Sequence, residues 1–199
     1  MPIETASTPF TRDPILVDLA LQGGGSHGAF TWGVLDCLLE EPWLGMDGIS
    51  GTSAGAMNAA VLADGYAKGG PAGAREALGK FWRCVSDAAR FSPFKRGLLD
   101  VLLGRWTLDS SPMYLAMDLM SRLVSPYQLN PKGTNPLREI LVDLVDFERL
   151  AQSSIKLYIT ATNVRTGRGH VFKNGTITPD VLLASACLPT MFQAHSDRR

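Results

Sequence analysis

The chain has 199 residues, of which 45% are hydrophobic and 19% charged, and its formal net charge is +0. This length suits one globular domain with a sizeable core, and the composition gives no sign of disorder. The 19 basic residues balance the 19 acidic ones without forming a basic block, so we expect no nucleic-acid partner. No stretch approaches the roughly 18 apolar residues of a membrane span, and the N-terminus lacks a secretory signal. We therefore expect a cytoplasmic protein.

The three cysteines, Cys37, Cys84 and Cys187, follow no spacing typical of metal ligands. All three have apolar neighbours in the sequence, which predicts buried, reduced thiols. We expect neither a metal nor a cofactor.

The first third of the chain predicts two strand–turn–helix units in succession. Residues 1–13 have the character of a flexible polar leader. The apolar run from Ile15 to Leu21 is typical of a strand buried on both faces of a parallel sheet. Three glycines follow it, and then apolar residues at helical spacing up to Pro42. A second strand over about 46–50 leads into GTSAG and a small-residue helix, which indicates an α/β fold with a mostly parallel sheet.

The rest of the chain continues as one domain over residues 14–199, without internal repeats. Asn135 is a good helix cap, and Pro136 suits the first helical position. The predicted elements are, in order, a helix over 71–90, short helices and loops over 91–133, a helix after Asn135, a strand over 155–164, its hairpin partner over 170–175 and a last helix opened by Thr178.

The segment Gly51–Gly55, GTSAG, matches the G-x-S-x-G pattern of a nucleophile elbow. A serine at a tight strand-to-helix turn exposes its Oγ, and small neighbours are needed because larger side chains would collide across the turn. The dipole of the following helix favours the negative charge that develops in acyl transfer. Ser53 as a simple helix cap is the alternative. The position between a strand and an alanine-rich helix favours the nucleophile.

A second loop, QGGGSHG, spans Gln22 to Gly28. Consecutive glycines let the backbone approach a ligand and direct N–H groups at an anion. The spacing also fits a dinucleotide-binding fingerprint, which requires an acidic residue at the end of the second strand. Here that strand ends in Ser50-Gly51-Thr52-Ser53, which contains no acidic residue, so the dinucleotide fingerprint lacks its second requirement. Because both loops follow neighbouring parallel strands, we favour an oxyanion hole facing Ser53 across one crevice.

With both motifs in this order and spacing, the sequence resembles the patatin-like phospholipases. The stretches NPLREIL, ITATNVRTG and ASACLPTMF are also similar to bacterial members. The resemblance implies a three-layer α/β fold and a Ser-Asp dyad that cleaves lipid or phospholipid esters, with peripheral membrane contact. It implies Ser53 as nucleophile and an oxyanion hole at Gly23, Gly24 and Gly25. The supporting motif residues would be His27, Gly28, Gly51 and Gly55.

The sequence departs from the family pattern at two points. His27 stands where the family usually has arginine, and we favour a loop role over a base because no carboxylate is placed to orient it. The family's Asp-Gly motif does not follow ASACLPTMF, and we assign the catalytic aspartate to neither Asp180 nor Asp197. The domain therefore reads as C-terminally incomplete, with core strands missing, and we expect the chain as written to be inactive or impaired. Two alternatives stay open: a non-catalytic remnant with a lipid-binding crevice, and a nucleotide-binding module.

Overall fold

A computed structural model describes residue 13, residues 15–90 and residues 135–187 of the chain. The predicted leader apart from Asp13, the weakly patterned segment 91–133 and the candidate Asp197 lie outside these residues.

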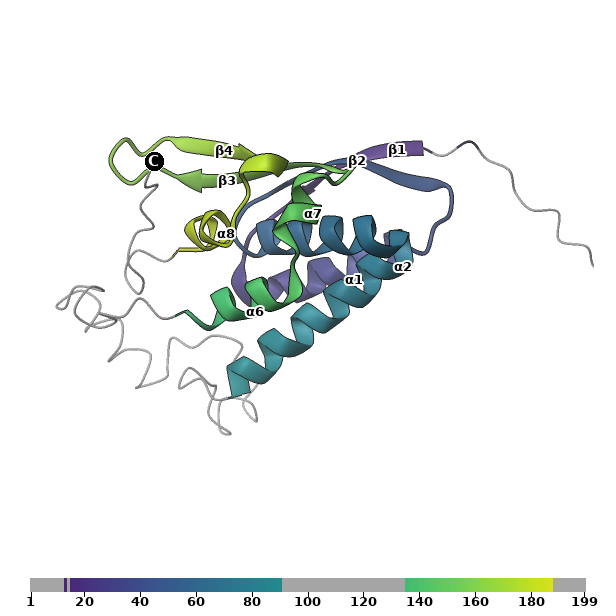
Figure 1. Ribbon diagram of the computed structural model, residues 1–199, viewed down its shortest axis with the longest axis horizontal. Coiled ribbons are helices and arrows are strands. Elements are labelled where there is room, and N and C mark those ends of the chain that lie inside the picture. Colours follow the sequence, from purple (N-terminus) through teal and green to yellow (C-terminus); the bar gives the residue numbers. More distant parts are fainter. Residues whose placement is uncertain (1–12, 14, 91–134, 188–199) are drawn as a thin grey trace, which may run out of the picture.

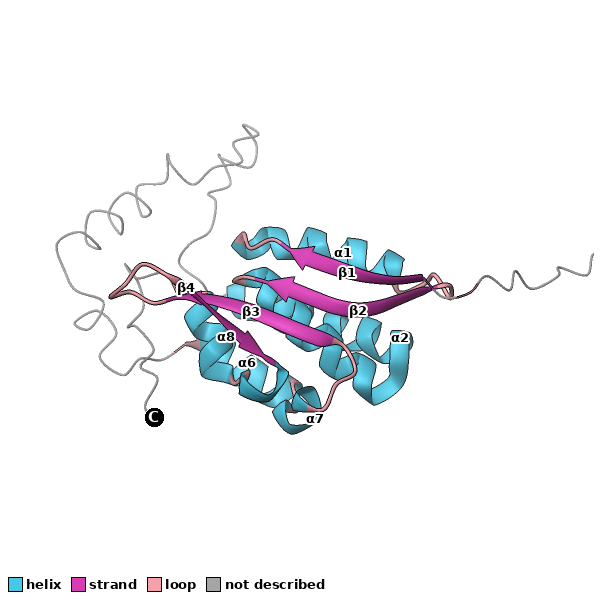
Figure 2. Ribbon diagram, turned by 90° about the horizontal axis from the view of Figure 1, so that it is seen from above, coloured by secondary structure: helices cyan, strands magenta, loops and turns pink. Residues whose placement is uncertain are grey.

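Four strands form one sheet in the order β1-β2-β3-β4. They are β1 (Ile15–Leu21), β2 (Leu44–Gly51), β3 (Lys156–Thr162) and β4 (Gly169–Lys173). β1 pairs with β2 and β2 with β3 in parallel, whereas β3 and β4 form the predicted antiparallel hairpin (Figure 2). The mostly parallel α/β architecture is confirmed.

The described helices lie beneath this sheet, on one face of it (Figure 1). They are α1 (Gly28–Leu38), α2 (Ala54–Arg90), α6 (Pro136–Leu144), α7 (Phe147–Ala151) and α8 (Pro179–Ser185), with short 3-10 turns η1 (Gly25–His27) and η2 (Asn174–Thr176). α2 is interrupted at Gly69 and Gly70, whose backbone is not helical, and Pro71 begins its second segment. This second segment is the helix predicted over 71–90.

Polar side chains fix the beginnings of the shorter helices as the sequence predicts. The Asn135 side chain accepts a hydrogen bond from the Leu137 N–H at 3.1 Å, and Thr178 accepts one from Val181 at 3.3 Å. A proline follows each cap at the first helical position, where its missing N–H costs nothing. Both predicted helix starts are confirmed.

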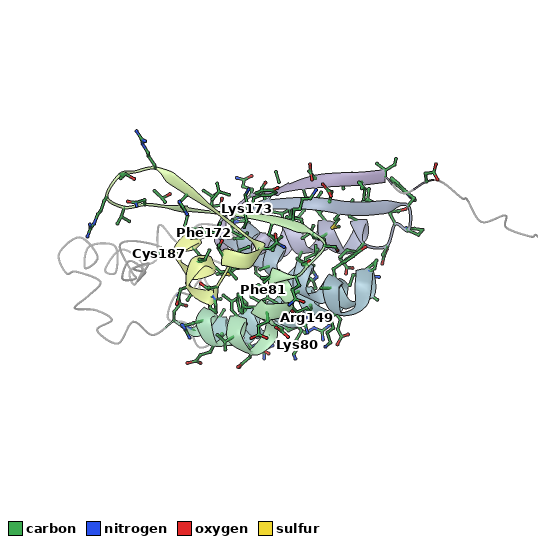
Figure 3. All side chains as sticks on the ribbon, turned by 45° about the horizontal axis from the view of Figure 1, so that its top comes forward. Lys80, Phe81, Arg149, Phe172, Lys173 and Cys187 are labelled. Atoms are coloured by element: carbon green, nitrogen blue, oxygen red, sulfur yellow. The ribbon has the colours of Figure 1, made fainter. Side chains whose placement is uncertain are left out.

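The core fills the space between the sheet and the helices. Ile49 of β2 and Leu157 and Ile159 of β3 are fully buried on the helical side. They belong to one core cluster with a row of buried residues along α2, among them Phe81 (Figure 3). Phe81 contacts Trp82 edge-on at a ring separation of 5.5 Å. Burial of this apolar surface is the main stabilising contribution to the domain.

The prediction that β1 is buried on both faces was wrong. β1 is the edge strand, and Ile15 and Leu16 remain 48% and 66% exposed. Asp18 lies on the exposed face, where its carboxylate sits over Gly48 of β2. A second helical layer, expected for a three-layer fold, is not among the described residues. An apolar run reports a strand's composition but not its place in the sheet order.

The prediction for the cysteines was also wrong in part, because Cys37 is exposed on α1. Cys84 and Cys187 are half-buried, and no disulfide joins the three, all of which lie in the described part of the chain.

Candidate active site

Ser53 has a strained backbone, with φ of 56°. Among the described residues it is the one non-glycine residue with positive φ, a region that costs an L-residue roughly 1–2 kcal/mol. It lies between the end of β2 and the start of α2, in a turn closed by the Gly55 N–H donating to the Thr52 carbonyl at 3.0 Å. Such strain persists only where the surrounding structure enforces it, and it concentrates at functional sites.

The packing around this turn accounts for both flanking glycines. A methyl group on Gly51 would approach the backbone carbonyl of Gly55 to 2.7 Å. A methyl group on Gly55 would collide with the carbonyl oxygen of Leu21, at the end of β1. The start of α2 therefore lies directly against the end of the neighbouring strand, and only glycine fits there.

The glycine-rich loop lies beside Ser53 because β1 and β2 end in register, with Leu21 opposite Gly51. A Cβ on Gly23 would lie 3.1 Å from the Ser53 Cβ and 3.0 Å from the Thr52 carbonyl oxygen, so the loop passes so close to the elbow that a side chain at Gly23 would be crowded. Gly24 and Gly25 have φ of 146° and 58°, values that favour glycine. The sequence placed both loops at the ends of neighbouring parallel strands, and this placement is confirmed.

His27 closes the glycine-rich loop upon itself. Its ring Nδ1 lies 3.0 Å from the Gly24 carbonyl oxygen, which also accepts the His27 backbone N–H at 3.2 Å. Because the partner is a carbonyl, Nδ1 carries the proton and donates it. Nδ1 is thus used within the loop, and no hydrogen bond joins the described His27 ring to Ser53.

Asn58, which the sequence reasoning missed, fastens the end of this loop to the core. It is fully buried, one turn beyond the elbow on α2. Its Nδ2 donates to the Gly28 carbonyl at 2.9 Å, and its Oδ1 accepts from the Trp82 indole at 2.8 Å. A Cβ on Gly28 would approach the Trp82 ring to 2.8 Å, so this glycine is needed for helix α1 to pack against α2.

Ser185 was also missed. This last residue of α8 accepts a hydrogen bond from the Ser53 N–H at 2.9 Å and donates one to the Thr160 carbonyl at 2.7 Å. The two partners lie 132 and 25 residues away in the sequence, so no local pattern could reveal the contact. The resemblance of ASACLPTMF to bacterial relatives was the one available signal.

Two ion pairs of the described residues join α2 to other helices. Arg149 of α7 binds the buried Asp64 of α2 through two hydrogen bonds of 2.8 and 2.9 Å on the helical side of the sheet (Figure 3). Arg75 binds Asp36 at 2.8 and 3.0 Å, and its hydrogen bonds and charge hold the pKa of that carboxyl below its usual value. These pairs join α2 to α7 and to α1.

In the described part of the chain, no three histidine, cysteine, aspartate or glutamate side chains gather as metal ligands would. None of its helices combines the length and the apolar character needed to cross a bilayer.

The comparison with protein families identifies the chain. Residues 19–198 match the model of the patatin-like phospholipases. The chain belongs to the patatin-like phospholipase family. The family suggested by the two glycine-containing motifs is thereby confirmed, and it covers nearly the whole sequence.

Two solved structures from Pseudomonas aeruginosa are similar to this patatin-like chain. One is the heterodimeric ExoU–SpcU complex of the type III secretion system, with 24% identity and a TM-score of 0.40 over 94% of this chain. The other, full-length SpcU with full-length ExoU, has 25% identity and a TM-score of 0.37 over 91% of this chain. The chain spans 38% and 39% of the lengths of the matched chains. A search of curated proteins gave no match.

Proposed function

We propose that this patatin-like chain carries the nucleophile and the oxyanion hole of a serine acyl hydrolase that cleaves carboxylic esters of lipids. The observation that carries the proposal is the left-handed backbone of Ser53, held between β2 and α2 in contact with Gly23. A turn that merely capped a helix would not need this strain, because an ordinary N-cap residue has an extended backbone.

In the proposed reaction the Ser53 Oγ forms a bond to the ester carbonyl carbon while a base takes the hydroxyl proton. The carbonyl oxygen becomes an oxyanion, which the N–H groups of Gly23, Gly24 and Gly25 and the N-terminus of α2 would stabilise. The alcohol then leaves with a proton, and water cleaves the acyl-enzyme to release the fatty acid and Ser53. Family resemblance implies an aspartate as the base.

The described part of the chain assigns no base to Ser53. We therefore propose that residues 14–199 turn over esters slowly as they stand, because a serine hydroxyl without a base is a weak nucleophile. Membership of the family supports a lipid substrate and is the ground for proposing peripheral contact with membranes. A nucleotide-binding role for Gly23–Gly28 would leave the strain at Ser53 without a use.

A fluorophosphonate probe tests the proposal directly, because it forms a covalent bond with a serine hydroxyl that is presented beside an oxyanion hole. The purified chain is treated with the probe, and the modified residue is located by mass spectrometry. Because no base is assigned to Ser53, we expect an adduct that forms slowly on Ser53, disappears in Ser53→Ala and persists in Ser50→Ala, which removes a serine three residues away. A folded chain without an adduct on Ser53 would contradict the proposal and leave a non-catalytic remnant. Binding of NAD that survives in Ser53→Ala would favour the nucleotide module instead.

A further inference from the structure

One hydroxyl group joins three elements next to the elbow. Ser185 Oγ, at the end of α8, accepts from the Ser53 backbone N–H at 2.9 Å and donates to the Thr160 carbonyl of β3 at 2.7 Å. The hydroxyl has one proton, which it donates in the hydrogen bond to the Thr160 carbonyl. An oxygen lone pair of Ser185 is then free to accept the hydrogen bond from the Ser53 N–H. The β3 carbonyl thus fixes the direction in which Ser185 can accept a hydrogen bond.

The Ser53 N–H needs such a partner because of its position in the chain. It follows the end of the β2 ladder and precedes the first turn of α2, where backbone N–H groups have no acceptor within the helix. Ser53 is half-buried, and a backbone N–H shielded from water costs free energy when it has no acceptor. Without an acceptor, the turn would gain by changing its conformation so that this N–H could bind water. The left-handed conformation therefore depends on an acceptor supplied from another part of the fold.

We propose that Ser185 is a positioning residue for Ser53: its hydroxyl holds the backbone of the elbow so that the Ser53 Oγ stays presented to a substrate. The consequence for reactivity rests on the proposed function. The same contact occupies the Ser53 N–H, which leaves the stabilisation of an oxyanion to other amides. It also couples the docking of α8 to the geometry of the nucleophile.

The first test measures how fast the fluorophosphonate labels Ser53 at a series of probe concentrations. For Ser185→Ala we expect the maximal labelling rate to fall about tenfold, the usual scale of one lost hydrogen bond. The probe concentration that gives half the maximal rate should stay unchanged, because Ser185 does not touch the probe. Ser185→Thr keeps the hydroxyl and should recover most of the rate.

Thr178→Ala is the matched control, since it removes the cap at the other end of α8 and leaves Ser185 in place. We expect Thr178→Ala to loosen the helix but to label at close to the wild-type rate. An equal loss of rate in Thr178→Ala and Ser185→Ala, or wild-type labelling in Ser185→Ala, would overturn the inference.

The second test does not depend on activity. Hydrogen–deuterium exchange of the Ser53 amide should be about tenfold faster in Ser185→Ala than in the wild type or in Thr178→Ala. If Ser185→Ala does not fold, Ser185→Cys takes its place, because a thiol is a weaker hydrogen-bonding group and should give intermediate exchange. Unchanged exchange in a folded variant overturns the inference. Absent labelling of the wild type together with Ser185-dependent exchange would count against the proposed function alone.

Discussion

Asn58 joins the indole of Trp82 to the carbonyl of Gly28 through hydrogen bonds of 2.8 and 2.9 Å, and Asn58 is fully buried. The glycine-rich loop ends at Gly28, and Trp82 belongs to the second segment of α2. One buried amide therefore connects the loop beside Ser53 with the far half of the longest helix.

Asn58→Ala removes both hydrogen bonds and leaves the Trp82 indole N–H buried without a partner, whereas the Gly28 carbonyl keeps its hydrogen bond within helix α1. We expect the free energy of unfolding to fall by roughly 1–3 kcal/mol, the cost of one unsatisfied buried group. Denaturant unfolding followed by tryptophan fluorescence measures this loss. The control is Asn163→Ala on an exposed turn, where the lost bonds are replaced by water. A similar loss of stability in both variants would show that the buried hydrogen bonds of Asn58 contribute no more than the exposed ones of Asn163.

Gly55→Ala should disrupt the elbow, because its methyl group collides with the Leu21 carbonyl at the end of β1. A collision with backbone atoms cannot be relieved by a side-chain rotation, and we expect a loss of about 3 kcal/mol or failure to fold. Gly33→Ala on α1 is the matched control, since nothing lies within 4 Å of the added methyl group. This variant should be neutral or gain up to about 1 kcal/mol. Thermal unfolding of the two variants separates a packing constraint from a general effect of alanine.

How much of the site the sequence predicts depends on how local each feature is. The elbow and the glycine-rich loop are short continuous segments in which the glycines are needed for close backbone packing. The position of both motifs at the ends of neighbouring strands could therefore be predicted from the sequence. Ser185 and Asn58 act on residues from other elements, and a serine or asparagine inside a helical pattern carries no mark of such a partner. The edge position of β1 was missed for the same reason, because the order of strands in a sheet is a property of the whole fold.

The thiols should react at different rates. Burial raises the pKa of the Cys187 thiol above its usual value, so less of the reactive thiolate forms near neutral pH. Cys37 is exposed on α1. We expect iodoacetamide at pH 8 to modify Cys37 first and Cys187 several times more slowly, as followed by peptide mass spectrometry. Faster modification of Cys187 in the folded chain would contradict its burial, and the difference should vanish in denaturant.

The acid sensitivity of the domain should depend in part on Asp146, the cap of α7. Its carboxylate accepts hydrogen bonds from the Arg149 N–H at 3.0 Å and the Glu148 N–H at 3.1 Å. The Arg149 N–H is the main cause that lowers the pKa of Asp146 from its ordinary value of 3.8. A lowered pKa in the folded state means that the carboxylate stabilises the fold above the unfolded pKa, and that this contribution is lost as the pH falls through the folded pKa.

Asp146→Asn isolates this contribution, because asparagine caps a helix about as well as aspartate but does not titrate. We expect the wild type to be more stable than Asp146→Asn at neutral pH, and the difference to shrink from about pH 5 downward as the carboxylate takes up its proton. Denaturant midpoints of the two proteins between pH 7 and the acid transition measure the change. Asp143→Asn, which alters an exposed carboxylate on α6, controls for the loss of one negative charge. If the difference between the wild type and Asp146→Asn stayed constant down to the acid transition, the charge of the cap would play no part, and the amide and the carboxylate would serve α7 equally at every pH.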